Sequence, residues 1–185
     1  MATAETKPNA QFTDVKTLRA NARQNIDDGA VTKTYPADRE TIIAKLQESL
    51  ATEWVCVLRY TRHYHTATGL VSEPVKMHFL EHAKEEQAHA MMLAERIVQL
   101  GGEPDLNPDN LTKLSHAEYR EGKTLKDMVK EDLIAERIAI DSYRELIDYI
   151  GDRDTTTRKM LMHILEQEEE HADEFSDLLD GWEGE

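Results

Sequence analysis

Hydrophobic residues recur at steps of three and four along four long stretches of the chain, with polar residues between them. This spacing is typical of amphipathic helices, because it places the apolar side chains on one helix face. The four stretches are residues 38–67, 73–100, 124–150 and 154–179. At about 1.5 Å per residue, each helix would be roughly 40 Å long. No alternating strand pattern competes with them, so the chain is predicted to be all-α, a four-helix bundle.

The expected helix ends carry capping residues. Asp38 can cap the first helix, and Thr124 with Asp127 can form a capping box at the start of the third. Short joins link the first helix to the second and the third to the fourth, so we expect each of these pairs to be antiparallel. The join 101–123 is a long crossover between the second and third helices, and it can run the length of the bundle.

The bundle is expected to follow an N-terminal extension. We expect an extension over 1–37, the bundle over 38–180 and a short tail over 181–185. Within the extension, residues 1–12 look disordered, and 14–31 could form a short amphipathic helix. Its apolar side would carry Val15, Leu18, Ala22 and Ile26.

Each of the four apolar helix faces is interrupted by a single glutamate. These glutamates are Glu53, Glu86, Glu136 and Glu168. One such carboxylate could reach solvent, but four uncompensated buried carboxylates would each cost several kcal/mol. A domain that is stable by about 5–15 kcal/mol could not tolerate that penalty. We therefore expect a cation between them.

Two of the glutamates belong to a repeated Glu-x-x-His motif, which places a carboxylate and an imidazole on one helix face. The motif pairs Glu86 with His89 and Glu168 with His171. The chain therefore resembles two similar helix hairpins, each contributing one Glu and one Glu-x-x-His. Four carboxylates and two neutral histidines carry a charge that two divalent metal ions would balance. Oxygen and imidazole ligands without thiolate suit iron or manganese, and zinc would also bind.

Composition narrows the expected environment and partners. The formal net charge is −15, which favours cations over nucleic acid as partners. The single cysteine, Cys56, can form no internal disulfide, which suits a reducing cytoplasm. The longest apolar run covers only residues 54–58, so we expect no membrane span. The expected location is cytoplasmic.

At these residues the sequence resembles the ferritin-like superfamily, and most closely the bacterioferritins and the Dps-like mini-ferritins. The resemblance covers residues 40–180 and rests on four segments. These are LATEWVCVLRY, EEQAHAMMLAERIVQLGGEPD, DLIAERIAI and ILEQEEEHADEF. A Glu from each of two helices with a Glu-x-x-His from each of the other two is the ligand pattern of this superfamily. The fold it implies is a ferritin-like four-helix bundle with a long crossover between helices 2 and 3.

The resemblance implies a dinuclear ferroxidase centre with two Fe ions per subunit. Glu53 and His89 would hold one iron, Glu136 and His171 the other, and Glu86 and Glu168 would bridge them. Fe(II) would be oxidised by O₂ or H₂O₂, and the ferric mineral would be stored in a protein shell. Tyr60 would support the ligands, and Asp132 could orient a ligand histidine or simply be an exposed helix residue.

Three departures from the bacterioferritin pattern change the expectation. Gln87 stands where bacterioferritins have a haem-binding Met, so we predict no haem. The short fifth helix of 24-subunit ferritins is not found after the fourth helix, which favours a homo-oligomer of 12 subunits over 24. The third departure is the N-terminal extension over residues 1–37, together with a short insertion near SHAEYREG. The extension contains acidic residues as well as lysines and arginines, and the whole chain is acidic, so DNA binding is not expected.

Two alternative functions fit the same residues. The first is a soluble di-metal oxidase, peroxidase or oxygenase that does not store iron. Rubrerythrin-type peroxidases usually add a cysteine cluster, which one Cys excludes, and demethoxyubiquinone hydroxylases need an apolar membrane-facing helix, which a mean hydropathy of −0.64 does not indicate. The second alternative is a helical interaction module, which is metal-stabilised or metal-free.

Overall fold

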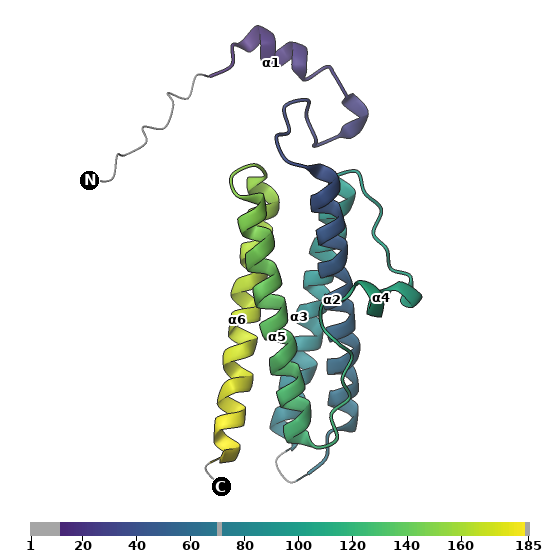
Figure 1. The fold of residues 1–185 in the computed structure, drawn as a ribbon, viewed down its shortest axis with the longest axis vertical. Coiled ribbons are helices and arrows are strands. Elements are labelled where there is room, and N and C mark those ends of the chain that lie inside the picture. Colours follow the sequence, from purple (N-terminus) through teal and green to yellow (C-terminus); the bar gives the residue numbers. More distant parts are fainter. Residues whose placement is uncertain (1–11, 70–71, 184–185) are drawn as a thin grey trace, which may run out of the picture.

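The computed structural model describes residues 12–69 and 72–183, and helices are its only regular elements within those ranges (Figure 1). They are α1 (Val15–Asn21), the 3₁₀ turn η1 (Ile26–Asp28), α2 (Arg39–Thr66), α3 (Ser72–Gln99), α4 (Pro108–Leu114), α5 (Leu125–Ile150) and α6 (Thr155–Glu183). The predicted all-α bundle is confirmed, with α2, α3, α5 and α6 as its four long helices. None of the helices in the described part of the chain is long and apolar enough to cross a membrane.

The bundle consists of two antiparallel hairpins, α2 with α3 and α5 with α6 (Figure 1). The crossover leaves the end of α3, passes through α4 along the outside of α2, and enters α5 at the opposite end of the bundle (Figure 1). Helices α3 and α5 consequently run in the same direction. This arrangement lets a residue in the middle of each helix face the bundle axis at the same level.

Local capping explains most of the observed helix boundaries. The side chain of Asp38 accepts a hydrogen bond from the backbone N–H of Thr41 at 3.2 Å, and Thr124 and Asp127 form the expected capping box. The fourth helix continues to Glu183 instead of ending at residue 179. A glycine inside a helix costs only about 1 kcal/mol, and the packing of Trp182 against the lower core favours the extra turn past Gly181.

The N-terminal helix is shorter than the sequence suggested. It ends at Asn21 instead of spanning 14–31, and Asn25 adopts a left-handed conformation with φ of 53°. The side chains of Val15, Leu18 and Ile26 are exposed. A helix of seven residues gains little from its own hydrogen bonds, and these apolar side chains find no core to extend it. The disorder expected for residues 1–12 falls almost wholly outside the described residues.

Most of the apolar core belongs to an upper and a lower cluster, and a small third cluster packs α4 against α2. The upper cluster includes Leu50, Leu93, Ile147 and Ile164, and the lower one includes Phe79, Val129 and Phe175. Between them the four helices place their buried glutamates. The two clusters therefore close a polar layer from above and below.

A buried ionic network fastens the crossover to the bundle. Asp132 is fully buried, and its oxygens accept from Arg59 Nε at 2.7 Å and from His63 Nδ1 at 2.8 Å. Arg59 and His63 in turn bind the backbone carbonyls of Glu118 and Glu121 in the crossover. Both carboxylate oxygens of Asp132 are thus taken by residues of α2. The structure corrects both roles suggested for Asp132, since it is neither exposed nor in contact with a candidate ligand histidine.

A second buried carboxylate joins three segments at the other end of the bundle. Asp154 caps α6 by accepting from Thr157 N, and it also binds Arg96 of α3 and the hydroxyl of Tyr35. Burial opposes ionisation, but the hydrogen bonds from Thr157, Tyr35 and Arg96 lower the pKa of Asp154 to about 2. Ionised Asp154 is therefore a source of stability at neutral pH.

We predict that Asp154→Asn lowers the free energy of unfolding by about 2 kcal/mol at pH 7, because the folded state loses a carboxylate with a depressed pKa. A depressed pKa stabilises the fold above the unfolded value near 4 and loses this effect as pH falls toward 2. The difference between the variant and the parent chain should therefore shrink between pH 4 and pH 2. Urea unfolding at several pH values measures it.

The matched control is Asp152→Asn, which changes an exposed carboxylate of the same turn and should alter stability by less than about 0.5 kcal/mol. A difference between Asp154→Asn and the parent chain that stays constant down to pH 2.5 would contradict the assigned role.

Candidate metal centre

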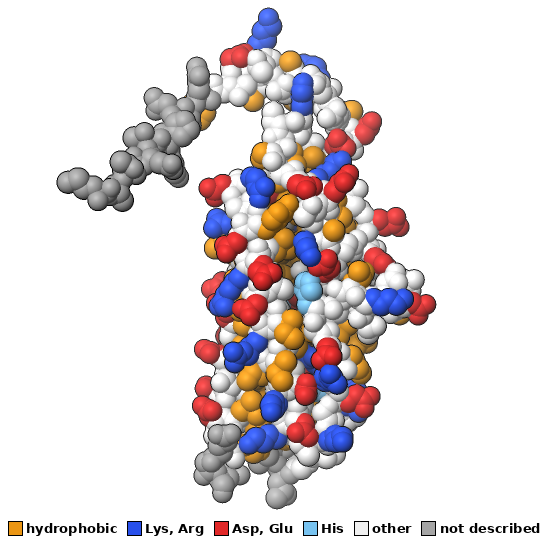
Figure 2. Space-filling model, viewed as in Figure 1, with side chains coloured by type: hydrophobic (Ala, Val, Ile, Leu, Met, Phe, Trp, Pro, Cys, Tyr) orange, Lys and Arg blue, Asp and Glu red, His pale blue; other side chains and the backbone are white. Residues whose placement is uncertain are grey.

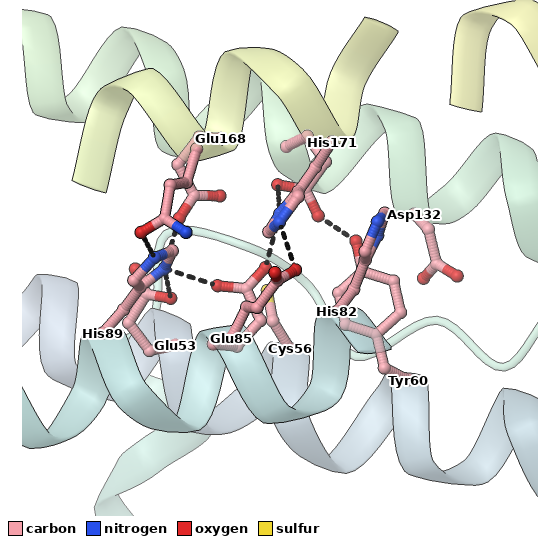
Figure 3. Close-up of polar contacts among 12 residues, drawn as sticks. Glu53, Cys56, Tyr60, His82, Glu85, His89, Asp132, Glu168 and His171 are labelled. Carbon is pink, nitrogen blue, oxygen red and sulfur yellow. Dashed lines mark hydrogen bonds and ion pairs between the residues drawn. The ribbon is translucent and has the colours of Figure 1, made fainter. Parts of the chain in front are cut away.

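The six residues expected to bind metal meet in the polar layer of the bundle (Figure 3). Their ligand atoms form two groups, and within each group all of them lie within 4.8 Å of one another. One group is Glu53, Glu86, His89 and Glu168, and the other is Glu86, Glu136, Glu168 and His171. The two groups share Glu86 and Glu168. This overlap is the arrangement that two neighbouring metal ions with two bridging carboxylates would need.

Helix geometry explains why these side chains converge. Helices α2 and α5 each contribute one glutamate, whereas α3 and α6 each contribute a Glu-x-x-His whose two side chains lie one turn apart on the same face. All six residues are at most 3% exposed. The site is therefore closed from bulk water by the helices that carry it.

Each histidine directs one ring nitrogen into the centre and the other away from it. His89 Nδ1 lies 3.1 Å from Glu86 Oε2, while its Nε2 faces Gln167 Oε1 at 3.0 Å. His171 Nδ1 lies 3.4 Å from Glu86 Oε1, while its Nε2 faces Glu85 Oε2 at 2.9 Å. If each Nε2 donates its proton to these oxygens, each Nδ1 presents a lone pair to the centre, which is how histidine binds a metal.

The residues that orient the histidines occupy equivalent positions, and they are not among the residues expected from the sequence. Glu85 comes directly before Glu86 on α3, and Gln167 directly before Glu168 on α6. Each therefore reaches across to the histidine of the opposite helix. The repeat of Glu-x-x-His offered this signal, since the position before each motif glutamate is related by the same repeat. The two partners differ in charge, so His171 has the more strongly attracting neighbour.

Two tyrosines hold the two glutamates that are not shared. Tyr60 donates a hydrogen bond to Glu136, and Tyr143 donates one to Glu53. Each tyrosine lies seven residues after the glutamate of its own helix and binds the glutamate of the other one. A supporting role was expected for Tyr60 but not for Tyr143. The repeat indicates this role for Tyr143 too, because it places Tyr143 at the equivalent position of the other hairpin. Burial, followed by the charge of Glu53, raises the pKa of Tyr143, which keeps its proton on the oxygen.

The carboxylates strongly influence one another's ionisation. Burial, and then the negative charge of Glu86, raises the pKa values of Glu53 and Glu168 well above their ordinary range. For Glu86 burial acts in the same direction, but contacts with Glu53 and the two histidines outweigh it and lower the pKa. The cluster thus holds mixed charge states when no cation compensates the carboxylates.

The two histidines compensate part of this negative charge by binding protons. Burial by itself would lower the pKa of His171, but Glu136 and Glu86 raise it to about 11. Carboxylates raise the pKa of His89 as well, also against the effect of its burial. Without metal ions, these protons therefore offset part of the negative charge of the carboxylates. Binding of two metal ions would release the protons.

Several potential metal-ligand atoms of the cluster have no hydrogen-bond partner in the described part of the chain. They are Glu86 Oε1, Glu168 Oε1 and His171 Nδ1. Glu168 Oε1 does lie 2.9 Å from His89 Nδ1, but without hydrogen-bond alignment. Buried polar atoms are rarely left unpaired. Carboxylate oxygens and imidazole nitrogens aimed at one another suit divalent iron, manganese or zinc, so the residues fit a pair of such ions.

The fold and the buried residues together define the class of protein: a helical bundle with a buried centre of carboxylates and histidines. The family model for the ferritin-like domain matches residues 43–184, and the chain belongs to that family. The expected superfamily is thereby confirmed.

Comparisons with individual proteins agree with this assignment. The chain is 32% identical to the DNA protection during starvation protein of Pyrococcus furiosus, over 78% of this chain and 80% of the relative. The dodecameric thioferritin of Bacteroides fragilis, a bacterioferritin-related protein, superposes with a TM-score of 0.76 at 30% identity, over 79% of this chain and 88% of the other. A ferritin-like, diiron-carboxylate protein of Bacillus anthracis gives 0.68 at 25% identity, over 76% and 96%.

Replacing a shared glutamate should affect metal binding differently from replacing an unshared one. Glu86→Gln should weaken Co(II) binding at both expected metal positions roughly tenfold or more, because Glu86 belongs to both groups of ligand atoms. Glu53→Gln should weaken mainly one of them. Calorimetric titration of metal-free protein with Co(II), together with the visible spectrum of the bound ion, distinguishes these patterns.

The control is Glu169→Gln, which changes an exposed carboxylate beside Glu168 and should leave both affinities unchanged. Equal binding by the Glu86→Gln and Glu169→Gln variants, both folded by circular dichroism, would argue against a shared ligand at position 86.

Proposed function

We propose that the chain is a ferroxidase that oxidises Fe(II) with O₂ or H₂O₂ and retains the ferric product in a homo-oligomeric shell. The observation that carries this proposal is the convergence of four buried glutamates and two buried histidines, several of whose donor atoms lack partners. A diiron-carboxylate protein and a bacterioferritin-related protein among the similar structures support iron as the metal.

In this proposal Fe(II) is the substrate, and each ligand has a defined task. Glu53 and His89 bind one ion, Glu136 and His171 bind the other, and the remaining two glutamates bridge them. Two Fe(II) ions bound side by side can together supply the two electrons that reduce H₂O₂ to water or O₂ to H₂O₂.

The charge of the centre favours the oxidation. Four carboxylates balance two divalent ions, and they attract two trivalent ions more strongly because each ion then carries one more positive charge. Hard oxygen ligands also suit ferric iron. Tyr60 and Tyr143 hold the unshared glutamates by hydrogen bonds, so the ligands do not have to reorganise around each new pair of ions.

The apolar clusters above and below the centre have a chemical role as well as a structural one. They exclude bulk water from the layer that contains the six ligands. In such surroundings the attraction between carboxylates and metal ions is stronger than in water. The two orienting residues, Glu85 and Gln167, keep the histidine lone pairs directed at the ions.

A shell requires that copies of the chain associate, and the surface offers apolar side chains for such contacts. Those exposed by 40% or more include Leu58, Met77, Met91, Val98, Ile134 and Tyr149. Figure 2 shows hydrophobic side chains in the groove between the two hairpins, among interspersed acidic and basic ones. The similar thioferritin is described as dodecameric, and we propose 12 subunits instead of 24 for this chain.

We propose that any protection of DNA would act through removal of Fe(II) and its oxidant. The similar Pyrococcus furiosus protein is named for DNA protection. The net charge of −15 on the present chain opposes contact with the phosphate backbone. The second candidate function is a di-metal oxidase, peroxidase or oxygenase that stores nothing, and it shares the centre but not the shell.

One loading experiment tests the proposal against this alternative. Metal-free protein receives a large excess of Fe(II) in air and is then passed over a sizing column, with iron and protein measured in every fraction. We expect ferric iron far above two ions per chain to elute with a particle the size of twelve subunits.

A chain that carries both Glu86→Gln and Glu168→Gln should lose protein-catalysed oxidation of Fe(II), because the bridging carboxylates are lost. Only the slow oxidation of free Fe(II) in air should remain. Glu169→Gln should oxidise Fe(II) at the parent rate. About two irons per chain on a monomer or dimer would refute storage and leave the di-metal enzyme. Unchanged oxidation in the bridging variant would refute the ferroxidase centre itself.

A further inference from the structure

A second group of metal-binding side chains lies beside the dinuclear centre, between α3 and α6. It consists of His78, His82 and Glu174, whose ligand atoms all lie within 4.8 Å of one another. His78 Nδ1 and His82 Nε2 both face the same oxygen, Glu174 Oε2, at 3.0 Å each. None of these three residues belongs to the six that form the centre.

The spacing along the two helices explains the grouping. His78 and His82 are four residues apart on α3 and so share one face, and His82 lies two turns before His89. Glu174 lies three residues after His171, one turn further along α6. The cluster thus continues the line of ligands of the centre toward one end of the bundle.

Exposure differs across the cluster in a graded way. The side chains of His78 and Glu174 are 37% and 39% exposed, whereas His82 is 2% exposed. An ion arriving from solvent would therefore meet His78 and Glu174 first. It would then contact His82, which forms the inner wall of the cluster.

His82 connects this cluster to the centre. Its ring stacks on that of His171 with centroids 4.0 Å apart and planes 19° apart. His82, Glu85 and His171 also bring one ligand atom each within 4.8 Å of one another (Figure 3). Glu85, itself 36% exposed, is the residue that orients His171. A continuous series of donor side chains therefore leads from the surface to the dinuclear centre.

Two features of the cluster indicate a ligand beyond the protein itself. His82 Nδ1 is buried and has no hydrogen-bond partner among the described residues. If Nε2 donates its proton to Glu174, this Nδ1 carries a lone pair that no described residue uses, so His82 retains an unused ligand atom in its group with Glu85 and His171. In addition, His78 and His82 each direct one ring nitrogen at the same oxygen of Glu174, so three potential ligand atoms already converge on one point.

We propose that His78, His82 and Glu174 form a third, mononuclear site for a divalent cation, which receives Fe(II) from solvent and passes it to the dinuclear centre by way of Glu85. Two histidines and one carboxylate suit Fe(II), Co(II) or Zn(II) and leave coordination positions open for water or for the next ligand. The binding site stands on its own geometry, while the transfer of Fe(II) rests on the proposed ferroxidase function.

Binding is tested with Co(II) in a chain whose bridging glutamates are replaced, Glu86→Gln with Glu168→Gln, so that the centre does not dominate the titration. We expect one remaining site with a visible Co(II) spectrum. Adding His78→Ala and Glu174→Gln should weaken it roughly tenfold or more. These two positions are chosen because they are partly exposed, whereas replacing buried His82 would disturb its packing against Phe175 and His171.

The matched controls are His163→Ala and Glu170→Gln, an exposed histidine and an exposed glutamate of α6, which should leave the site unchanged. An anomalous-scattering crystal structure with Co(II) would locate the ion directly. If no Co(II) site responds to His78→Ala and Glu174→Gln, or if the control pair weakens binding equally, the third site does not exist.

Transfer is tested in the chain with an intact centre. The pair His78→Ala and Glu174→Gln should raise the Fe(II) concentration needed for half-maximal oxidation, by about fivefold to tenfold, if these ligands supply the centre. The rate at saturating Fe(II) should stay at the parent value, because the reacting ions still meet the same six ligands. An unchanged half-maximal concentration would overturn the transfer role even if Co(II) binds. Complete absence of oxidation in the parent chain would instead refute the proposed function and leave the Co(II) result standing.

Discussion

The structure depends on the burial of four carboxylates and two imidazoles in the middle of a bundle core. Each of these side chains is nearly inaccessible to water, and a buried charge without a partner costs several kcal/mol. The surrounding apolar clusters make this penalty larger, because they exclude water on both sides of the layer. Protons on the histidines and on some carboxylates reduce the penalty, and a pair of divalent cations would replace those protons.

Both helix hairpins provide the same set of side chains to the polar layer. Each hairpin provides a glutamate followed by a tyrosine seven residues later, and a Glu-x-x-His preceded by an orienting residue. The tyrosine and the orienting residue act across the bundle, on the glutamate or histidine of the other hairpin. The polar layer therefore joins the hairpins to each other. The repeat is not perfect, since Glu85 is charged and Gln167 is neutral, so His171 and His89 differ in electrostatic environment.

The remaining buried charges stabilise the frame around this layer. Asp132 with Arg59 and His63 fastens the crossover to α2 and α5, and Asp154 with Arg96 fastens the start of α6 to α3. Neither network includes any of the six residues of the polar layer: Asp132 lies one turn before Glu136 on α5, and Asp154 lies at the start of α6. The frame around the polar layer thus has stabilising contacts of its own, which do not involve the six central side chains.

The sequence by itself determined the four long helices, their principal caps and the six residues that meet at the centre. These features follow from helix periodicity and from the high free energy of an unpaired buried carboxylate, which are both local or general rules. Only the tertiary structure decided which residues pair across helices: Tyr143 with Glu53, Gln167 with His89, and Asp132 with Arg59 and His63. It also revealed the contact of His82 with His171 and Glu174. Such pairs depend on the rotation and axial shift of one helix against another, and these are set by the packing of whole faces instead of by the spacing within one helix.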